Sequence, residues 1–274
     1  MQFSVVITTY DKPYHLQRAL GGYACQTYTG FDLVVADDGS DARTKEVVDA
    51  FRARSPVPVK HLWHEHEGFR KTVILNKALA ATTADYLIFT DDDCLVRSDF
   101  VQSHVRLAER GRFLSGGVVY LPPERSAAVT PDDVTSQRIF HPAWHGGLNS
   151  AFGLGGKINQ PPWAAWLLDH VSPTKPTFNG HNSSAWRSDI VAVNGFDERL
   201  GYGGLDRELG ERLTNAGVRG KRIRYRAVCL HLDHDRRYRD AAVIARNREL
   251  RREVRRERRA WTEFGLVRAD AARG

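Results

Sequence analysis

Short apolar runs rich in β-branched residues alternate with segments of helical periodicity over residues 1–120. The apolar runs predict strands, and the periodic segments predict helices between them. The expected strands are 3–8, 32–36, 59–63, 86–90 and 113–120. The expected helices are 13–24, 42–53, 70–81 and 99–110, with Asp11 and Ser98 as N-caps of the first and the last. This alternation predicts an α/β fold with a mainly parallel, Rossmann-like sheet flanked by helices.

The regular alternation stops between residues 121 and 176, where proline, glycine, tryptophan and histidine become frequent. Long irregular segments in compact domains are often binding loops or lids, although a packed surface loop whose tryptophans cover the core would have the same composition. Regular structure is expected again over 177–186, in a helix that begins near Gly204, and in short strands around 222–231.

The basic charge of the chain is concentrated near its C-terminus. The net charge is +7, and residues 236–259 alone hold eleven arginines and four acidic residues, so the rest of the chain is balanced. The pattern predicts one long basic helix over 236–261. Its apolar stripe consists of Val243, Leu250, Val254 and Trp261. The stripe favours docking onto the globular domain, and adhesion to anionic lipid is the alternative.

Several features bound the location of the protein. The longest apolar stretches are far shorter than the ~20 residues of a membrane-spanning helix, and the first residues lack the basic region and cleavage site of a secretory signal. Cys25, Cys94 and Cys229 are odd in number and widely spaced, which supports neither a disulfide framework nor a zinc knuckle. We expect a cytoplasmic protein, peripheral on the inner face of the plasma membrane if the basic helix binds lipid.

Polar residues follow three of the predicted strands at their carboxyl ends. In parallel α/β sheets ligands bind beyond this edge, so the residues that follow each strand are candidates for a site. The three sets are Thr8, Thr9 and Tyr10, then Asp37 and Asp38, then Asp91, Asp92 and Asp93. We expect the three sets to converge on one rim of the sheet.

The acidic triplet at 91–93 favours a metal site. The chain has neither GxGxxG after a strand nor GxxxxGK[ST], so a phosphate would have to be held by another means. Adjacent carboxylates repel one another unless a cation neutralises them, and a divalent metal would do so while bridging to a diphosphate. A solvated acidic turn is the alternative, but the position after a hydrophobic strand favours the metal.

The sequence resembles glycosyltransferase family 2 in a series of motifs that occur in the expected order. They are VVITTY (5–10), VVADDGS (34–40), GFR (68–70) with NKA (76–78), FTDDDC (89–94), NGHNSS (179–184) and NGFDERLGYGGLDREL (194–209). The last two look like the acceptor half of galactosyltransferase-type and chondroitin-polymerase-type members. The resemblance implies a GT-A fold and an enzyme that moves a sugar from a nucleotide diphosphate donor to a hydroxyl group.

The same resemblance implies a donor site in the first half of the chain. Its nucleotide-binding residues would be Thr8, Thr9, Tyr10, Asp37, Asp38, Arg70, Asn76, Asp91 and Asp92. Asp93 would be the principal metal ligand of the DxD motif. His231 would complete the shell around Mn²⁺ or Mg²⁺, with His234 as the alternative.

An acceptor site is implied in the second half. Its residues would be Asn182, Gly203, Gly204 and Trp163. Asp206 is the candidate general base, with Glu208 as the fallback, because a carboxylate can take the proton of an attacking hydroxyl; a cap of the following helix is the alternative role for Asp206. Leu205 stands where related enzymes usually have Glu, which removes one acceptor-binding carboxylate.

Together these inferences predict an inverting, metal-dependent glycosyltransferase. UDP is the favoured nucleotide, and the acceptor would be a glycan or a lipid-linked or lipopolysaccharide-type molecule. The expected organisation is a nucleotide-sugar half at 1–120, an acceptor and catalytic half of the same domain at 121–235, and a basic helix and tail at 236–274. A sugar nucleotidyltransferase and a nucleic-acid-binding protein are the alternatives, and we expect no nucleic-acid partner because carboxylate clusters repel phosphates.

Overall fold

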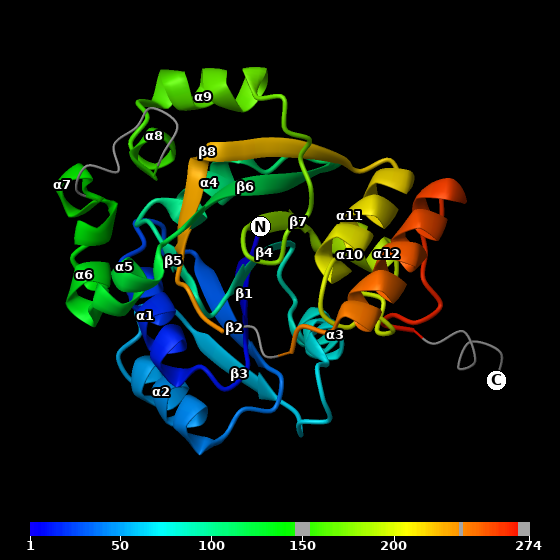
Figure 1. The fold of residues 1–274 in the computed structure, drawn as a ribbon, viewed down its shortest axis with the longest axis horizontal. Coiled ribbons are helices and arrows are strands. Elements are labelled where there is room, and N and C mark those ends of the chain that lie inside the picture. Colours follow the sequence, from blue (N-terminus) through cyan, green and yellow to red (C-terminus); the bar gives the residue numbers. More distant parts are fainter. Residues whose placement is uncertain (146–153, 236–237, 268–274) are drawn as a thin grey trace.

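The computed structural model describes residues 1–145, 154–235 and 238–267 (Figure 1). Among these residues, eight strands form one sheet in the order β3-β2-β1-β4-β7-β6-β8-β5. The strands are β1 (Phe3–Thr9), β2 (Phe31–Asp37), β3 (Val59–Trp63), β4 (Tyr86–Asp91), β5 (Cys94–Val96), β6 (Arg112–Tyr120), β7 (Ser183–Trp186) and β8 (Arg219–His231). Only the pairings of β7 and β5 are antiparallel, which confirms the predicted mainly parallel α/β sheet.

Helices cover both faces of the sheet. They include α1 (Pro13–Ala24), α2 (Ala42–Arg52), α3 (Lys71–Ala81), α4 (Phe100–Leu107), α10 (Arg187–Ala192) and α11 (Leu205–Asn215). Every residue of β1 is buried: Val5 and Ile7 pack in the layer with α1, α2 and α4, and Val6 packs in the layer with α3, α10 and α11. Figure 1 shows these two groups of helices on opposite sides of β1 and β4. Burial on both faces explains why the strands are continuous apolar runs.

The two predicted N-caps are wrong. Helix α1 follows Lys12 and α4 follows Asp99, and neither cap residue makes a side-chain hydrogen bond to its helix. Asp11 has a φ of 49°, and its carboxylate accepts a hydrogen bond from the backbone N–H of Asp41 (3.1 Å). Asp11 therefore ties the loop after β1 to the loop after β2 instead of starting a helix.

The segment expected to be irregular contains short helices. They are α5 (Pro123–Ala128), α6 (Pro131–Thr135), η1 (Arg138–Phe140), α7 (Pro142–His145), α8 (Leu154–Ile158) and α9 (Pro162–Val171). Four of them begin at a proline, whose missing N–H costs nothing in a first helical turn, so the prolines start helices here instead of preventing them. Residues 146–153, which include the glycines at 146, 147 and 153, lie outside the described residues.

The C-terminal part also differs from the expected boundaries. β8 is one strand of 13 residues where several short strands were expected. The basic helix is α12 (Ala241–Arg256), shorter than the predicted 236–261, and residues 236–237 are outside the described part. Asp240 caps it by accepting from the backbone N–H of Ala242 and Val243. Each helix within the described residues is too short or too polar to span a lipid bilayer.

A buried hydrogen-bond network crosses the antiparallel part of the sheet. Asn182 donates from Nδ2 to the carbonyls of Gly117 (2.8 Å) and Ala227 (3.0 Å), so its Oδ1 is left to accept from His104 Nε2 (3.0 Å). The neutral His104 ring then accepts at Nδ1 from the Ser184 hydroxyl (2.8 Å). Burial lowers the pKa of His104 to about 4, because the charged ring would lose its hydration.

This network predicts a loss of stability in mild acid. An unfolded histidine has a pKa of about 6.5, so between pH 6.5 and about 4 the unfolded state binds a proton that folded His104 does not. The free energy of unfolding should therefore fall as the pH is lowered, by at most about 1.4 kcal/mol per pH unit for this residue. Urea unfolding of the wild type and of His104→Gln at several pH values measures this. In His104→Gln, the number of protons bound on unfolding in this pH range should be smaller by about one. An unchanged slope of the free energy of unfolding against pH would contradict the assignment.

Candidate active site

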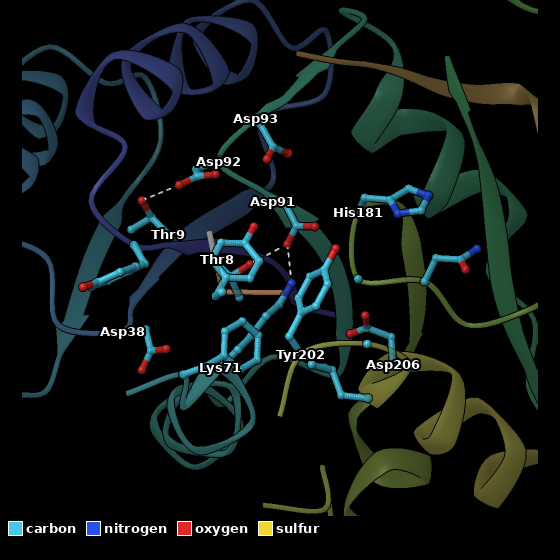
Figure 2. Close-up of a pocket in the computed structure, with 18 of the residues that line it drawn as sticks. Thr8, Thr9, Asp38, Lys71, Asp91, Asp92, Asp93, His181, Tyr202 and Asp206 are labelled. Carbon is cyan, nitrogen blue, oxygen red and sulfur yellow. Dashed lines mark hydrogen bonds and ion pairs between the residues drawn. The ribbon is translucent and has the colours of Figure 1, made fainter. Parts of the chain in front are cut away.

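A pocket of about 440 Å³ opens at the carboxyl ends of β1 and β4 (Figure 2). The loops after these strands, the start of α3 and the turn before β7 form its floor. The start of α11, the end of β8 and one face of α12 complete the wall. Figure 2 shows Asp38 and Asp206 on opposite sides of the pocket, with Asp91 and Lys71 between them. The pocket thus has two ends joined by a charged centre.

Strand register places two of the carboxylates. β1 and β4 pair in parallel with Thr8 opposite Asp91, and the Thr8 hydroxyl donates to Asp91 Oδ1 (2.5 Å). The Thr9 hydroxyl donates to Asp92 Oδ2 (2.7 Å). Burial opposes ionisation of Asp91, but the ammonium of Lys71 at 2.6 Å outweighs it and holds the pKa of Asp91 below its ordinary value. Burial raises the pKa of Asp92 to about 7.

Asp93 is the meeting point of three cationic or basic side chains. His231 Nε2 lies 3.3 Å from Oδ1, and His234 Nε2 lies 2.9 Å from Oδ2. Lys12 Nζ lies 3.1 Å from Oδ2. Although burial opposes it, these partners hold the pKa of Asp93 well below its usual range, and the hydrogen bond to Asp93 raises the pKa of His234.

The tautomers of the two histidines make this cluster suitable for a cation. His231 Nδ1 is 2.7 Å from the Leu232 carbonyl, and His234 Nδ1 is 2.7 Å from the Asp235 carbonyl. A carbonyl only accepts, so each Nδ1 carries a hydrogen, and a neutral ring turns its Nε2 lone pair toward the Asp93 carboxylate. The Nε2 lone pairs and the carboxylate oxygens repel each other unless a proton or a metal ion lies between them. Metal-bound histidines commonly donate their other N–H to a carbonyl in this way.

Cys94 is a weaker ligand candidate. One donor atom each of Asp93, Cys94 and His231 lies within 4.8 Å of the other two. Burial raises the pKa of the Cys94 thiol well above its ordinary value, and only the thiolate binds metal strongly. Asp93 and the two histidines are therefore the residues that fit a divalent ion.

Asp206 presents one carboxylate oxygen without a partner to the pocket. It is in the first turn of α11, and its buried Oδ1 has no hydrogen-bond partner among the described residues. Burial raises the pKa of Asp206, while the charge of Lys71 opposes that shift. Gly203 (φ 101°) and Gly204 (φ 95°) precede it in a left-handed conformation that favours glycine, and both line the pocket. This turn aims Asp206 into the cavity.

The basic helix supports that turn. Asn247 of α12 is fully buried, and its Nδ2 lies 3.0, 3.2 and 3.1 Å from the carbonyl oxygens of residues 201, 202 and 203. Val254 is buried, and Leu250 packs against the core layer that includes α11. The helix therefore docks on the domain through Leu250 and Val254 of its predicted apolar stripe, which is the first of the two alternatives considered from the sequence. Trp261, the last residue of that stripe, lies beyond the end of α12 and is 44% exposed.

Two residues expected at the nucleotide do not line the pocket. Asp37 is buried beneath the rim, where its Oδ2 lies 2.9 Å from His61 Nε2, whereas Asp38 faces the cavity. The Arg70 guanidinium pairs with Glu67, and only its backbone N–H contacts the rim, by donating to Asp38 Oδ2 (2.8 Å). Adjacent residues of an extended strand point to opposite faces, which explains why only one of the two aspartates reaches the pocket.

Three further predicted residues also lie elsewhere. Asn76 holds the backbone of Phe196 through both ends of its amide (2.8 and 2.9 Å). Asn182 belongs to the buried network described above and cannot contact an acceptor. Trp163 is 71% exposed on α9 and is not among the residues that line the pocket.

Glu208, the fallback base, is committed to an ion pair. Both its oxygens contact the guanidinium of Arg212 (2.7 and 2.8 Å), and both side chains are about fully buried. Arg212 also donates to the carbonyls of Val193 and Gly195. A carboxylate held in this way is not free to take a proton, which leaves Asp206 as the base candidate on α11.

The sequence interpretation missed several side chains of the pocket. They include Lys12, Lys71, Phe69, His181, Tyr202 and Tyr238. A cluster of aspartates requires counter-charges, which was a signal for lysines at the starts of the first and third helices. Burial lowers the pKa of His181 to about 4, so its ring is neutral at the pocket wall. The rings of Phe69, Tyr202 and Tyr238 contact one another with centroids 4.8–5.8 Å apart, which no sequence spacing indicates.

The docking of α12 gives a stability prediction. Asn247→Leu keeps the volume of the side chain but leaves three loop carbonyls without their donor, and it also removes the buried Oδ1 that has no partner. We expect the free energy of unfolding to fall by about 1–2 kcal/mol in urea titrations. Glu249→Gln, on the exposed side of the same helix, is the control and should change it by less than about 0.5 kcal/mol. Equal effects of the two variants would contradict this role of Asn247.

Comparison with known proteins places this site in a family. Residues 4–147 match Glycosyl transferase family 2, and residues 170–235 match the N-terminal domain of galactosyltransferase. Validoxylamine A glucosyltransferase of Streptomyces hygroscopicus is 31% identical over 233 residues, which cover 78% of this chain and 52% of that protein. Chondroitin synthase of Escherichia coli is 25% identical over 227 residues, which cover 78% of this chain and 32% of that protein. The chain thus spans about half and about a third of the length of these relatives.

Solved structures agree on the fold. A mannosyltransferase from Pyrobaculum calidifontis, in complex with GDP-Man and Mn²⁺, has a TM-score of 0.59 at 20% identity over 86% of this chain and 58% of that chain. Glucosyl-3-phosphoglycerate synthase from Mycobacterium tuberculosis, in complex with Mn²⁺ and UDP, has a TM-score of 0.54 at 18% identity over 93% and 79%. Both are GT-A glycosyltransferases, which confirms the predicted GT-A fold. Because the family match extends over more than half of its residues, the chain belongs to glycosyl transferase family 2.

Proposed function

We propose that this protein transfers a sugar from a nucleotide diphosphate donor, with UDP favoured, to a hydroxyl of a glycan or of a lipid-linked or lipopolysaccharide-type acceptor. The observation that carries the proposal is the pocket itself, in which Asp206, whose buried Oδ1 has no hydrogen-bond partner among the described residues, shares one cavity with Asp91, Asp92 and Asp93. Relatives named as glucosyltransferase and chondroitin synthase, and neighbours crystallised with GDP-Man or UDP, support a nucleotide-sugar donor.

The nucleotide would bind at the end of the pocket that contains Asp38. Thr8, Thr9 and Tyr10 line that end, and Asp38 is positioned to accept from an N–H of the base. One oxygen of Asp38 accepts from the backbone N–H of Arg70 and the other lies 2.7 Å from His64, so its orientation is fixed before a ligand arrives. In this proposal Asp38, rather than Asp37, recognises the nucleoside.

Asp93, His231 and His234 would hold a divalent cation, with Mn²⁺ favoured and Mg²⁺ the alternative because nitrogen and oxygen ligands are combined. When bound, such an ion neutralises charge on the departing nucleoside diphosphate. Lys12 beside Asp93 and Lys71 beside Asp91 are positioned to add positive charge near the phosphates. Asp91 and Asp92, whose carboxylates accept hydrogen bonds from the hydroxyls of Thr8 and Thr9, would orient the donor.

Asp206 would act as the general base. Its buried Oδ1 has a lone pair free for the acceptor hydroxyl, and burial raises its pKa, which increases its affinity for the proton. The acceptor oxygen would form its bond to the anomeric carbon while the bond to the diphosphate oxygen breaks, and the proton would pass to Asp206. A single displacement of this kind inverts the anomeric centre.

Contact between the basic helix and the inner face of an anionic plasma membrane remains a further proposal. Most arginines of the docked helix are paired within the protein, so this contact would depend on the exposed charges that are left. Flotation with phosphatidylglycerol vesicles, compared for the wild type and a variant with its exposed arginines changed to glutamine, tests it; equal flotation would discard it.

Asp206→Asn separates binding from chemistry. The amide has nearly the same shape but cannot take the proton, so we expect kcat to fall by about 10²–10⁴-fold while the affinity for UDP in the presence of Mn²⁺ stays within about twofold. Initial rates with a UDP-sugar and an accepted glycan, together with calorimetric titration of UDP, measure the two effects. Glu46→Gln, which neutralises an exposed carboxylate of α2 far from the pocket, is the control. A wild-type kcat in Asp206→Asn would exclude it as the base.

A further inference from the structure

The wall of the pocket beside Asp206 is built from arginine-rich helices. Arg207 follows Asp206 on α11, and Arg248 and Arg251 of α12 also line the cavity. The two helices meet at the glycine turn: a Cβ added to Gly204 would be 3.2 Å from the Arg251 side chain. Arg251, which follows Arg248 by about one helical turn, thus lies against the turn that precedes Asp206, at the proposed acceptor end of the pocket.

The hydrogen bonds of α12 separate one arginine from the others. Arg251 and Arg255 donate to Glu211, Arg252 to Glu249, Arg256 to Glu257, and Arg246 to the carbonyl of Arg199. Within the described part of the chain, Arg248 has no hydrogen-bond or ion-pair partner. The same holds for Arg207 on α11. The helix thus satisfies five of its six guanidinium groups internally, and the one left over, Arg248, lines the pocket together with Arg207 and the paired Arg251.

The charge balance of the pocket differs between its two ends. At the metal end, Lys12 is paired with Asp93 (3.1 Å) and Lys71 with Asp91 (2.6 Å). At the acceptor end, the exposed side chains of Arg207 and Arg248 line the same pocket as Asp206, and no carboxylate of the described residues contacts either guanidinium. A guanidinium recognises carboxylate and phosphate groups through paired, parallel hydrogen bonds. A neutral acceptor would offer neither guanidinium such a partner.

We propose that the acceptor is anionic and presents a carboxylate or phosphate to Arg207 and Arg248 while its reactive hydroxyl lies at Asp206. The inference rests on the proposed function, because it names the class of acceptor for the same site. The two cations would also offset the repulsion between the acceptor charge and the carboxylate of Asp206. In this account the basic helix contributes to substrate selection.

The test uses the full chain saturated with UDP and Mn²⁺, so that the phosphate end of the pocket is filled and an added anion must bind elsewhere. Glucuronate, glucose 6-phosphate and glucose are titrated separately and followed by NMR. We expect at least one of the two anions to bind about tenfold more tightly than glucose, and the stronger of the two identifies carboxylate or phosphate as the preferred group. Arg207→Gln and Arg248→Gln should each reduce this preference without changing the Kd of UDP.

Arg252→Gln is the matched control, because Arg252 lies on the same helix, pairs with Glu249 and does not line the pocket. It should retain the preference for the anion. Equal binding of charged and neutral probes, no binding of either anion, or a preference that survives the Arg207→Gln/Arg248→Gln double variant would overturn the proposal. If UDP itself fails to bind, the proposed function is contradicted and this inference with it.

Discussion

The structure depends on the accumulation of negative charge at one end of β4. Asp91, Asp92, Asp93 and Asp206 share one pocket, and like charges at short range raise the free energy of the ionised state unless cations balance them. Lysines from the starts of α1 and α3 and histidines from the end of β8 supply that balance. The elements that bring in these counter-charges are far apart in sequence, so the site requires the complete sheet.

The α12 helix is both a basic segment of the chain and a structural support of the pocket. The sequence concentrates the excess of positive charge in residues 236–259. The structure pairs five of the six arginines of α12 within the protein and leaves Arg248 unpaired at the pocket. The buried Asn247 holds the turn that aims Asp206. A segment that would be taken for a tail by composition alone is thus a wall of the pocket.

The parts that sequence could predict are those set by local periodicity. The first four strands and the helices between them follow from apolar runs and 3.6-residue spacing, and a parallel sheet brings the loops after the strands together. The sequence could not predict the features that depend on the direction in which a side chain points or on contacts with residues far away in the chain. Asp37 and Asp38 are equivalent by composition, and only the strand geometry turns one inward. Asn182 and Glu208 lie in motifs of the family, but Asn182 is held by buried partners 45 to 78 residues away, and Glu208 is held by Arg212 one helical turn along.

The central claim is that a cation is held between Asp93 and the diphosphate of a bound nucleotide. A crystal structure with UDP and Mn²⁺ tests it directly, because manganese can be located by its anomalous scattering. The account predicts a manganese ion bound by Asp93 and by one or both of His231 and His234, with a phosphate oxygen completing its shell. Bound UDP with no ion at that corner, or Asp93 turned away into solvent, would contradict it.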